Sequence, residues 1–138
     1  MERAKEVLEK KGLRATIHRI MILSYLMNTR SHPCIDEIYN QILKKIPTIS
    51  KTTVYNTLNS LVEYGLVNEL DLPEGSRFDY KRNNHAHFYC KVCKKVYDLN
   101  LEIPEVSESY EGHKIERIQY TLIGICKECL KKQKEEKE

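Results

Sequence analysis

The sequence predicts an α+β protein in which helices come first and short strands follow. Three observations support this prediction. Apolar residues keep helical spacing in four successive segments before residue 65, a hairpin pattern comes next, and short strand patterns with two Cys-x-x-Cys motifs make up the remainder. A length of 138 residues suits one domain or two small ones. We place the boundary at Arg82-Asn83-Asn84, which gives domains of residues 1–82 and 83–138.

Helix signals divide the first part of the chain. Residues 2–11 are charged and suited to a short helix, and Gly12 is a plausible stop. Thr16 can cap a second helix. A third helix begins after Pro33 and ends before Pro47, because the residue before a proline disfavours helical geometry.

The fourth helix carries the most informative surface. Ser50 caps it and Gly65 closes it. Its predicted buried stripe consists of Val54, Leu58, Leu61 and Val62. Its opposite face carries Lys51, Thr52, Tyr55, Asn56 and Asn59. Such a face suits a recognition helix in a DNA major groove, although a solvated polar face is the commoner reason for one on an arbitrary helix.

Two neighbouring elements favour DNA binding. The preceding helix, residues 34–45, ends a helix-turn-helix distance before the fourth. Residues 66–72 and 76–81 then flank the turn 73–75 as a β-hairpin. The N-terminal domain is therefore predicted to be a winged helix-turn-helix that binds double-stranded DNA. Further candidate DNA contacts at the start of the second helix are Arg14 and Arg19.

The charge distribution agrees with this interpretation. A net charge of +3 argues little by itself, but residues 1–60 hold ten Lys or Arg against five Asp or Glu. No apolar run approaches the roughly 20 residues of a membrane span, and the N-terminus lacks the apolar region of a signal peptide. We expect a cytoplasmic protein that does not enter a membrane.

The C-terminal part is predicted to be a small α/β dimerisation domain. A short helix over residues 104–111 interrupts the predicted strands, which are residues 86–90, 94–99 and 114–125. The last strand is too apolar for the edge of so small a unit, which favours an interface in a homodimer. The Lys- and Glu-rich tail after Cys129 is expected to be disordered.

Two cysteine pairs, Cys90 with Cys93 and Cys126 with Cys129, predict a structural zinc site. Four thiolates close a tetrahedral site with no open position. A thiol-disulfide centre is the alternative, but a thioredoxin-like motif needs a βαβ setting and a single pair. In the cytosol, paired motifs of this kind are more typical of zinc than of structural disulfides.

A second ligand set of different chemistry lies beside the first cysteine pair. His85 and His87 point to the same side of an extended strand. Asp79 and Asp98 are close in sequence, so imidazole and carboxylate groups can form a site that suits Fe, Mn, Co or Zn. The sequence therefore predicts two neighbouring metal sites, one soft and one hard.

Together these motifs resemble the ferric uptake regulator (Fur) superfamily of metal-dependent repressors over nearly the whole chain. The matching features are residues 12–16 with Arg19, His32-Pro33, residues 52–58, Gly65-Leu66-Val67, Arg77-Phe78-Asp79, His85-Ala86-His87 and both cysteine pairs. The chain is most similar to the peroxide-responsive branch, PerR, because Asp79 and Asp98 stand where iron-sensing members typically carry Glu. A further metal site of many Fur proteins lacks its ligands, since Asn84, Ala86 and Ile118 occupy those positions.

The resemblance implies a regulatory Fe²⁺ or Mn²⁺ held by His32, Asp79, His85, His87 and Asp98. It also implies structural Zn²⁺, a homodimer that binds a palindromic operator, no enzymatic role, and peroxide-driven oxidation of His32 or His85 that releases the DNA. The alternative is an iron, manganese or zinc uptake regulator without peroxide sensing. Two other classes are a metalloenzyme, for which we find no nucleophile or general base, and a zinc-stabilised protein-interaction module.

Cys34 departs from the expected pattern. It occupies the position of a Ser or Thr N-cap, with Glu37 three residues later as in a capping box. One interpretation is a small half-buried residue tolerated at some cost in stability. The other is a thiolate stabilised by the helix N-terminus beside His32, which would add a redox contact or perturb the metal site.

Overall fold

The structure is a computed structural model that describes residues 1–81, 86–104 and 106–137. It divides into two compact units, Met1–Arg82 and Asn83–Glu138. The predicted hinge, Arg82-Asn83-Asn84, and the candidate ligand His85 lie outside the described residues. Within the described ranges, no helix combines the length and the apolar character that crossing a membrane requires.

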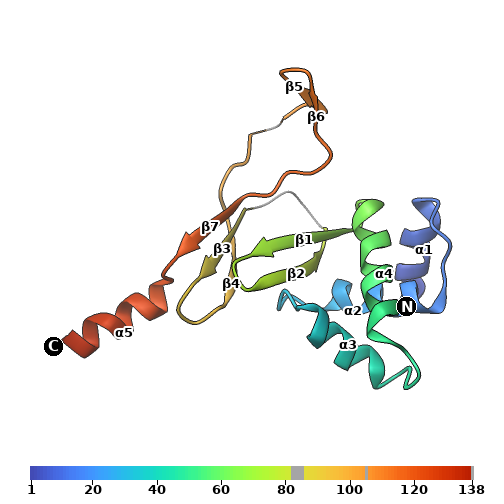
Figure 1. Cartoon of the computed structure of the whole chain (residues 1–138), viewed down its shortest axis with the longest axis horizontal. Coiled ribbons are helices and arrows are strands. Elements are labelled where there is room, and N and C mark those ends of the chain that lie inside the picture. The colour runs from blue at the N-terminus through green and yellow to red at the C-terminus, as the bar shows by residue number, and fades with distance from the viewer. Residues whose placement is uncertain (82–85, 105, 138) are drawn as a thin grey trace. The chain divides into compact units, whose positions relative to one another are not determined.

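The first unit begins with four helices (Figure 1). They are α1 (Glu2–Lys10), α2 (Ile17–Asn28), α3 (Ile35–Leu43) and α4 (Lys51–Glu63). The predicted caps of α2 and α4 are confirmed, because the side-chain oxygens of Thr16 and Ser50 accept the backbone N–H groups of Arg19 and Thr53 at 3.3 and 3.1 Å. The chain turns after α1 and α4 at glycines with a φ of 74°, a left-handed conformation that favours this residue.

A β-hairpin completes the first unit. Its strands β1 (Val67–Leu72) and β2 (Gly75–Tyr80) pair antiparallel, from Val67 opposite Tyr80 to Leu72 opposite Gly75. Phe78 is 2% exposed and joins the core formed by the helices. That core includes the fully buried Leu8, Ile22, Leu23, Leu26, Ile38, Val54, Leu58 and Leu61. The predicted winged-helix architecture, a helix-turn-helix followed by a hairpin, is therefore confirmed.

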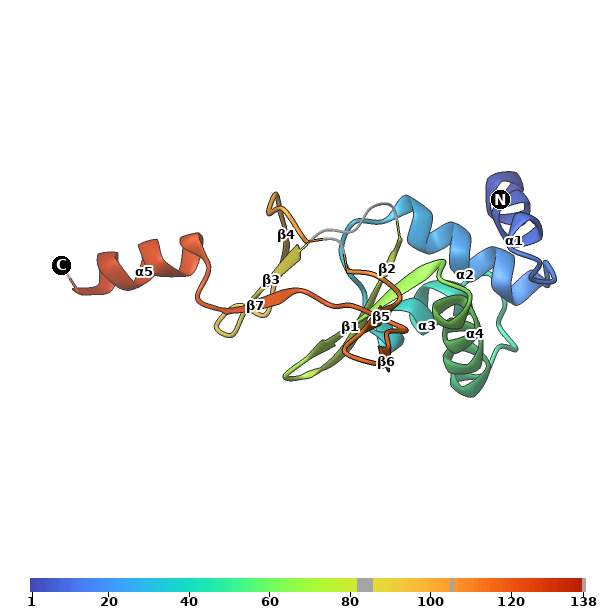
Figure 2. The ribbon, with the colours of Figure 1, turned by 90° about the horizontal axis from the view of Figure 1, so that it is seen from above.

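The second unit is built on one three-stranded sheet in the order β4-β3-β7. β3 (Ala86–Cys90) pairs antiparallel with β4 (Val96–Leu99) and parallel with β7 (Thr121–Gly124). A small separate hairpin joins β5 (Ser109–Tyr110) to β6 (His113–Lys114). Helix α5 (Lys127–Lys137) follows β7 and extends away from the sheet (Figure 2).

Two predictions for the second unit are wrong for related reasons. Residues 106–111 contain no helix, because Glu111 and Gly112 have φ values of 51° and 84° and form a two-residue hairpin turn. The predicted strand 114–125 is reduced to β7, because Lys114 belongs to β6 and residues 115–119 pair with no strand in the described ranges. An apolar sequence pattern does not by itself form a strand when the backbone N–H and C=O groups have no neighbouring strand to bond.

The tail after Cys129 also differs from the prediction, since it continues as helix α5. Its Lys, Glu, Gln and Leu residues all have good helix propensity. Lys131 and Glu128 add an ion pair at 3.9 Å across one turn, although such exposed pairs contribute little.

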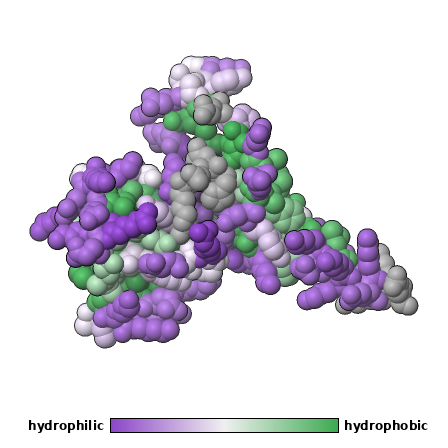
Figure 3. Space-filling model, turned by 180° about the vertical axis from the view of Figure 1, so that it is seen from behind, coloured by the Kyte–Doolittle hydropathy of each residue, from purple (hydrophilic) through white to green (hydrophobic). Residues whose placement is uncertain are grey.

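Apolar side chains remain exposed along the segment that contains β7. Ile118, Leu122 and Ile123 are 47%, 49% and 57% exposed. Figure 3 shows hydrophobic surface along this part of the second unit. Within the described residues, β7 has no strand on its outer edge. Exposed apolar surface at an open sheet edge is typical of a protein-protein interface.

Candidate metal centres

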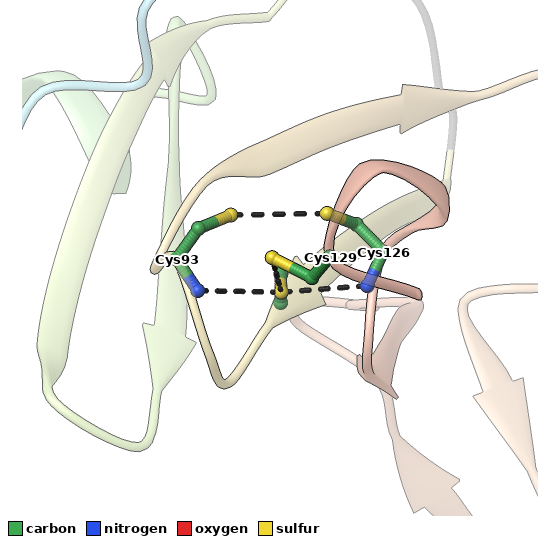
Figure 4. Close-up of side chains that lie close together, drawn as sticks. Cys93, Cys126 and Cys129 are labelled. Carbon is green, nitrogen blue, oxygen red and sulfur yellow. Dashed lines mark hydrogen bonds between the residues drawn. The ribbon is translucent and has the colours of Figure 1, made fainter. Parts of the chain in front are cut away.

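The four cysteines of the two motifs meet in the second unit (Figure 4). Cys90 ends β3 and Cys93 lies in the turn before β4. Cys126 directly precedes α5, and Cys129 lies in the first turn of that helix. Because β3 and β7 are parallel neighbours with Cys90 opposite Gly124, the sheet brings the two pairs together despite their separation in sequence.

The sulfur geometry fits a tetrahedral metal ion. The Sγ atoms of Cys90 and Cys129 are 3.8 Å apart, as are those of Cys93 and Cys126. Zinc-sulfur bonds of about 2.3 Å at tetrahedral angles place sulfurs about 3.8 Å apart, whereas a disulfide requires about 2.05 Å. All five cysteines are free thiols in the structure. The arrangement therefore fits zinc and does not fit a disulfide centre.

The surroundings of two of the four cysteines, Cys90 and Cys126, lower the pKa of their thiols. Burial raises the pKa of Cys90, but the backbone N–H groups of Cys93 and Cys126, both 3.4 Å from its Sγ, outweigh burial and lower the pKa to about 6. A hydrogen bond from Tyr97 lowers the pKa of Cys126. Burial raises the pKa of Cys129 to about 12, so a bound cation is needed to make this fourth group a thiolate.

A buried histidine-carboxylate pair lies in the first unit. His32 Nε2 is 3.6 Å from an oxygen of Asp79, and the two residues are 4% and 6% exposed. Two backbone contacts hold the loop beside β2, namely the N–H of Phe78 donating to the Pro33 carbonyl at 2.9 Å and the bridge between Cys34 and Arg77. These backbone contacts of the fold bring His32 and Asp79 together.

The backbone of His32 is strained. Its φ is 52°, although it precedes Pro33, a position that normally adopts extended geometry. Strain of this kind costs about 1–3 kcal/mol and is found most often at functional sites. The conformation favours a functional role for His32, and the sequence contained no signal for it beyond the resemblance.

A second histidine-carboxylate pair lies in the other unit. His87 on β3 and Asp98 on β4 are directly opposite in the antiparallel register. His87 Nε2 is 3.4 Å from Asp98 Oδ1, with the histidine buried and the carboxylate side chain 48% exposed. Each unit therefore contains one pair of an imidazole and a carboxylate, and His85, the remaining predicted ligand, lies outside the described residues.

Cys34 behaves as an ordinary polar residue at the start of α3. Its thiol donates to a carboxylate oxygen of Glu37 at 3.3 Å, and the helix has no side-chain N-cap hydrogen bond. The thiol is therefore engaged within the first turn of its own helix. The structure therefore favours the interpretation of Cys34 as a tolerated small residue over the redox interpretation.

The predicted DNA-reading face of α4 is accessible. Exposed side chains on it are Lys51, Thr52, Tyr55, Asn56 and Asn59. Lys51 forms an ion pair with Asp36 on α3, which the sequence did not predict. Arg14 is exposed, while Arg19 donates from Nη1 to the Arg14 carbonyl at 2.8 Å. Thus α4 offers a continuous polar surface, and Lys51 and Arg19 have partners within the protein.

Comparisons with known proteins agree with these features. The model of the ferric uptake regulator family matches residues 10–123. The "Peroxide operon regulator" of Bacillus subtilis is 36% identical, with 96% of this chain and 95% of that protein covered. The crystal structure of the Campylobacter jejuni peroxide stress regulator is 28% identical, covers 93% and 97% of the two chains and has a TM-score of 0.64. The Helicobacter pylori ferric uptake regulator, described with three functional metal-binding sites, is 26% identical, covers 94% and 90%, and has a TM-score of 0.70.

Proposed function

Since the chain belongs to the ferric uptake regulator family, whose members regulate transcription, we propose that it is a metal-dependent, peroxide-sensing repressor in the cytoplasm. The observation that carries the proposal is the presence of one buried-histidine and carboxylate pair in each unit, His32 with Asp79 and His87 with Asp98. Neither pair alone has enough ligands for a divalent metal, which takes four to six.

Both pairs, together with His85, would hold a single regulatory Fe²⁺ or Mn²⁺. Nitrogen and oxygen ligands suit these metals, whereas the four cysteines suit Zn²⁺. Because the ligands come from both units, the metal favours one arrangement of the units over others. Through linkage, an arrangement that also suits DNA binding makes metal affinity and operator affinity increase together.

DNA is read by the exposed face of α4, in two copies related by a two-fold axis. The exposed apolar segment around Leu122 and Ile123 supports a homodimer, and a palindromic operator matches two-fold symmetry. Lys51 must exchange its partner Asp36 for a phosphate when DNA binds. That exchange lowers the net binding free energy gained from the contact between Lys51 and the phosphate. We therefore expect uncharged residues of α4 to dominate specificity.

Peroxide sensing uses the histidine ligands as the groups that are modified. A bound Fe²⁺ would supply the redox chemistry for cleavage of the peroxide O–O bond. One peroxide oxygen replaces the hydrogen of an imidazole C–H in His32 or His85, and the other leaves as water. The modified ring is a poorer ligand, so metal is lost and the operator is released. The alternative, an uptake regulator without this step, shares the DNA and metal chemistry.

Metal affinity of single and double variants tests whether one ion joins the two pairs. His32→Ala and His87→Ala should each weaken Mn²⁺ binding by at least about 100-fold, and the double variant should weaken it little further, because the ion is already lost. His113→Ala, an exposed histidine on β6, is the matched control. Independent, additive losses measured by calorimetry would show that the pairs do not share an ion.

Mass spectrometry combined with DNA binding separates the peroxide sensor from the alternative. The Fe²⁺-loaded protein treated with peroxide should gain one oxygen atom on a peptide containing His32 or His85 and should lose operator affinity. The Mn²⁺-loaded protein should do neither. Retained affinity and unmodified histidines in the Fe²⁺ form would favour the uptake regulator.

A further inference from the structure

The predicted DNA-reading face of α4 carries a single charged side chain, Lys51. Its other members, which are uncharged, are Thr52, Tyr55, Asn56 and Asn59. The ammonium group of Lys51 forms an ion pair with the carboxylate of Asp36, which lies in the first turn of α3. The two side chains are 57% and 68% exposed, so the pair lies at the protein surface. The one charge of this face is therefore neutralised by a carboxylate of the protein itself.

The position of Lys51 favours an anionic partner. Lys51 is the first residue of α4, where the positive end of the helix dipole disfavours a cation and attracts anions, phosphate among them. The Asp36 carboxylate supplies that anion, and its hydrogen bond with Lys51 is the main reason why the pKa of the lysine is raised. A DNA phosphate offers the same ammonium group the same kind of charge-assisted hydrogen bond. The carboxylate and a phosphate are therefore alternative partners of one cation.

The β-hairpin that follows α4 adds little attraction for phosphate. Strands β1 and β2 hold four Asp or Glu residues against one Arg. That arginine, Arg77, forms an ion pair with Glu74 at 2.6 Å, again within the protein. Because an acidic element repels the phosphate backbone, the cations outside the hairpin must supply the sequence-independent attraction to DNA. The availability of Lys51 therefore affects DNA affinity more in this unit than it would beside a basic hairpin.

We propose that Asp36 is an internal competitor of DNA phosphate that sets the affinity of this protein for DNA of any sequence. It holds Lys51 in the free protein, and a phosphate must displace it when DNA binds. Because every sequence presents phosphates, the competition lowers operator affinity and nonspecific affinity alike. The affinity of the metal-free protein is thereby kept low, while the gain on metal binding is unchanged. The inference rests on the proposed binding of DNA by α4 and is independent of peroxide sensing.

Salt-dependent binding of the full-length, Mn²⁺-loaded protein to a short duplex of arbitrary sequence tests this role. Asp36→Asn keeps the shape of the side chain and removes its charge. It should raise the affinity about threefold for each exposed ion pair, and hence about 10-fold for a dimer. The plot of log affinity against log salt should become steeper by up to about 0.9 for each protomer. Glu63→Gln, which removes an equal charge from the exposed C-terminal end of α4, should leave this slope unchanged.

A double variant separates competition for Lys51 from general charge repulsion. In a Lys51→Met background, Asp36→Asn should raise DNA affinity no more than Glu63→Gln does, because the cation in dispute is gone. A full increase in that background would overturn the proposal. An unchanged or lower affinity of the Asp36→Asn single variant would overturn it as well, since Asp36 would then orient Lys51 for DNA. A wild-type protein that binds no duplex at low salt would instead contradict the proposed function.

Discussion

The cysteine set and the two histidine-aspartate pairs differ in how their residues are distributed between the two units. All four cysteines belong to one unit and are brought together by adjacent strands β3 and β7. The pairs are divided, with His32 and Asp79 in one unit and His87 and Asp98 in the other. Soft ligands within one unit suit a metal whose binding is part of folding, whereas hard ligands divided between units suit the regulatory role proposed above.

Replacing one cysteine should have the largest effect of any single change. Cys126→Ser should abolish zinc binding and unfold the second unit, because zinc bound by such a small unit contributes an apparent binding free energy of about 10–16 kcal/mol. Zinc content and circular dichroism provide the measurements. Cys34→Ser is the matched control and should retain zinc, because Cys34 contacts Glu37 and lies outside the cluster. If Cys126→Ser remained folded and still contained zinc, metal binding by the cysteine set would not be part of folding.

Selective chelation sharpens the comparison without mutation. EDTA should remove the regulatory metal and lower operator affinity by about 10–100-fold, which corresponds to a coupling free energy within the usual 1–3 kcal/mol. Zinc should remain, since three of its four thiols are buried, whereas Asp98 of the regulatory set is 48% exposed. Metal analysis before and after chelation, with a DNA-shift assay, provides the test. Simultaneous loss of both metals would mean that the cysteine site is also exchangeable.

Local signals in the sequence predicted most of the first unit and the composition of the cysteine set. Capping by Thr16 and Ser50 depends on residues three positions apart, so a sequence pattern contains the whole interaction. The shortened strand β7 was missed, because strand extent depends on partners distant in sequence. The turn at Glu111-Gly112 is local, and the helix prediction for residues 104–111 overlooked it.

Lengthening one carboxylate side chain should separate metal binding from peroxide chemistry. Asp98→Glu moves the carboxylate by about 1.5 Å, one carbon-carbon bond, relative to His87. Mn²⁺-dependent operator binding should persist within about threefold, because a carboxylate ligand is still present. Histidine oxidation by peroxide should fall by about 10-fold, because it depends on the position of the metal more steeply than binding does. Equal oxidation yields in both proteins, measured by mass spectrometry, would show that histidine oxidation does not depend on the length of this carboxylate side chain.

The smallest expected effect comes from the turn that runs from Cys90 to Lys94. Lys94 has a φ of 67°, and its N–H donates to the Cys90 carbonyl at 2.9 Å. A left-handed conformation costs a non-glycine residue about 1–2 kcal/mol, and glycine adopts it freely but loses more entropy on folding. Lys94→Gly should therefore stabilise the zinc-bound second unit by up to about 1 kcal/mol, detectable as a higher denaturant midpoint at fixed zinc. Operator affinity should not change, since the turn supplies Cys93 and backbone N–H groups that bond to Cys90, and it supplies no ligand to either histidine pair. If Lys94→Gly lowered metal-dependent DNA binding while leaving the midpoint unchanged, the turn would serve regulation, and the two ligand sets would be less separable than their connectivity indicates.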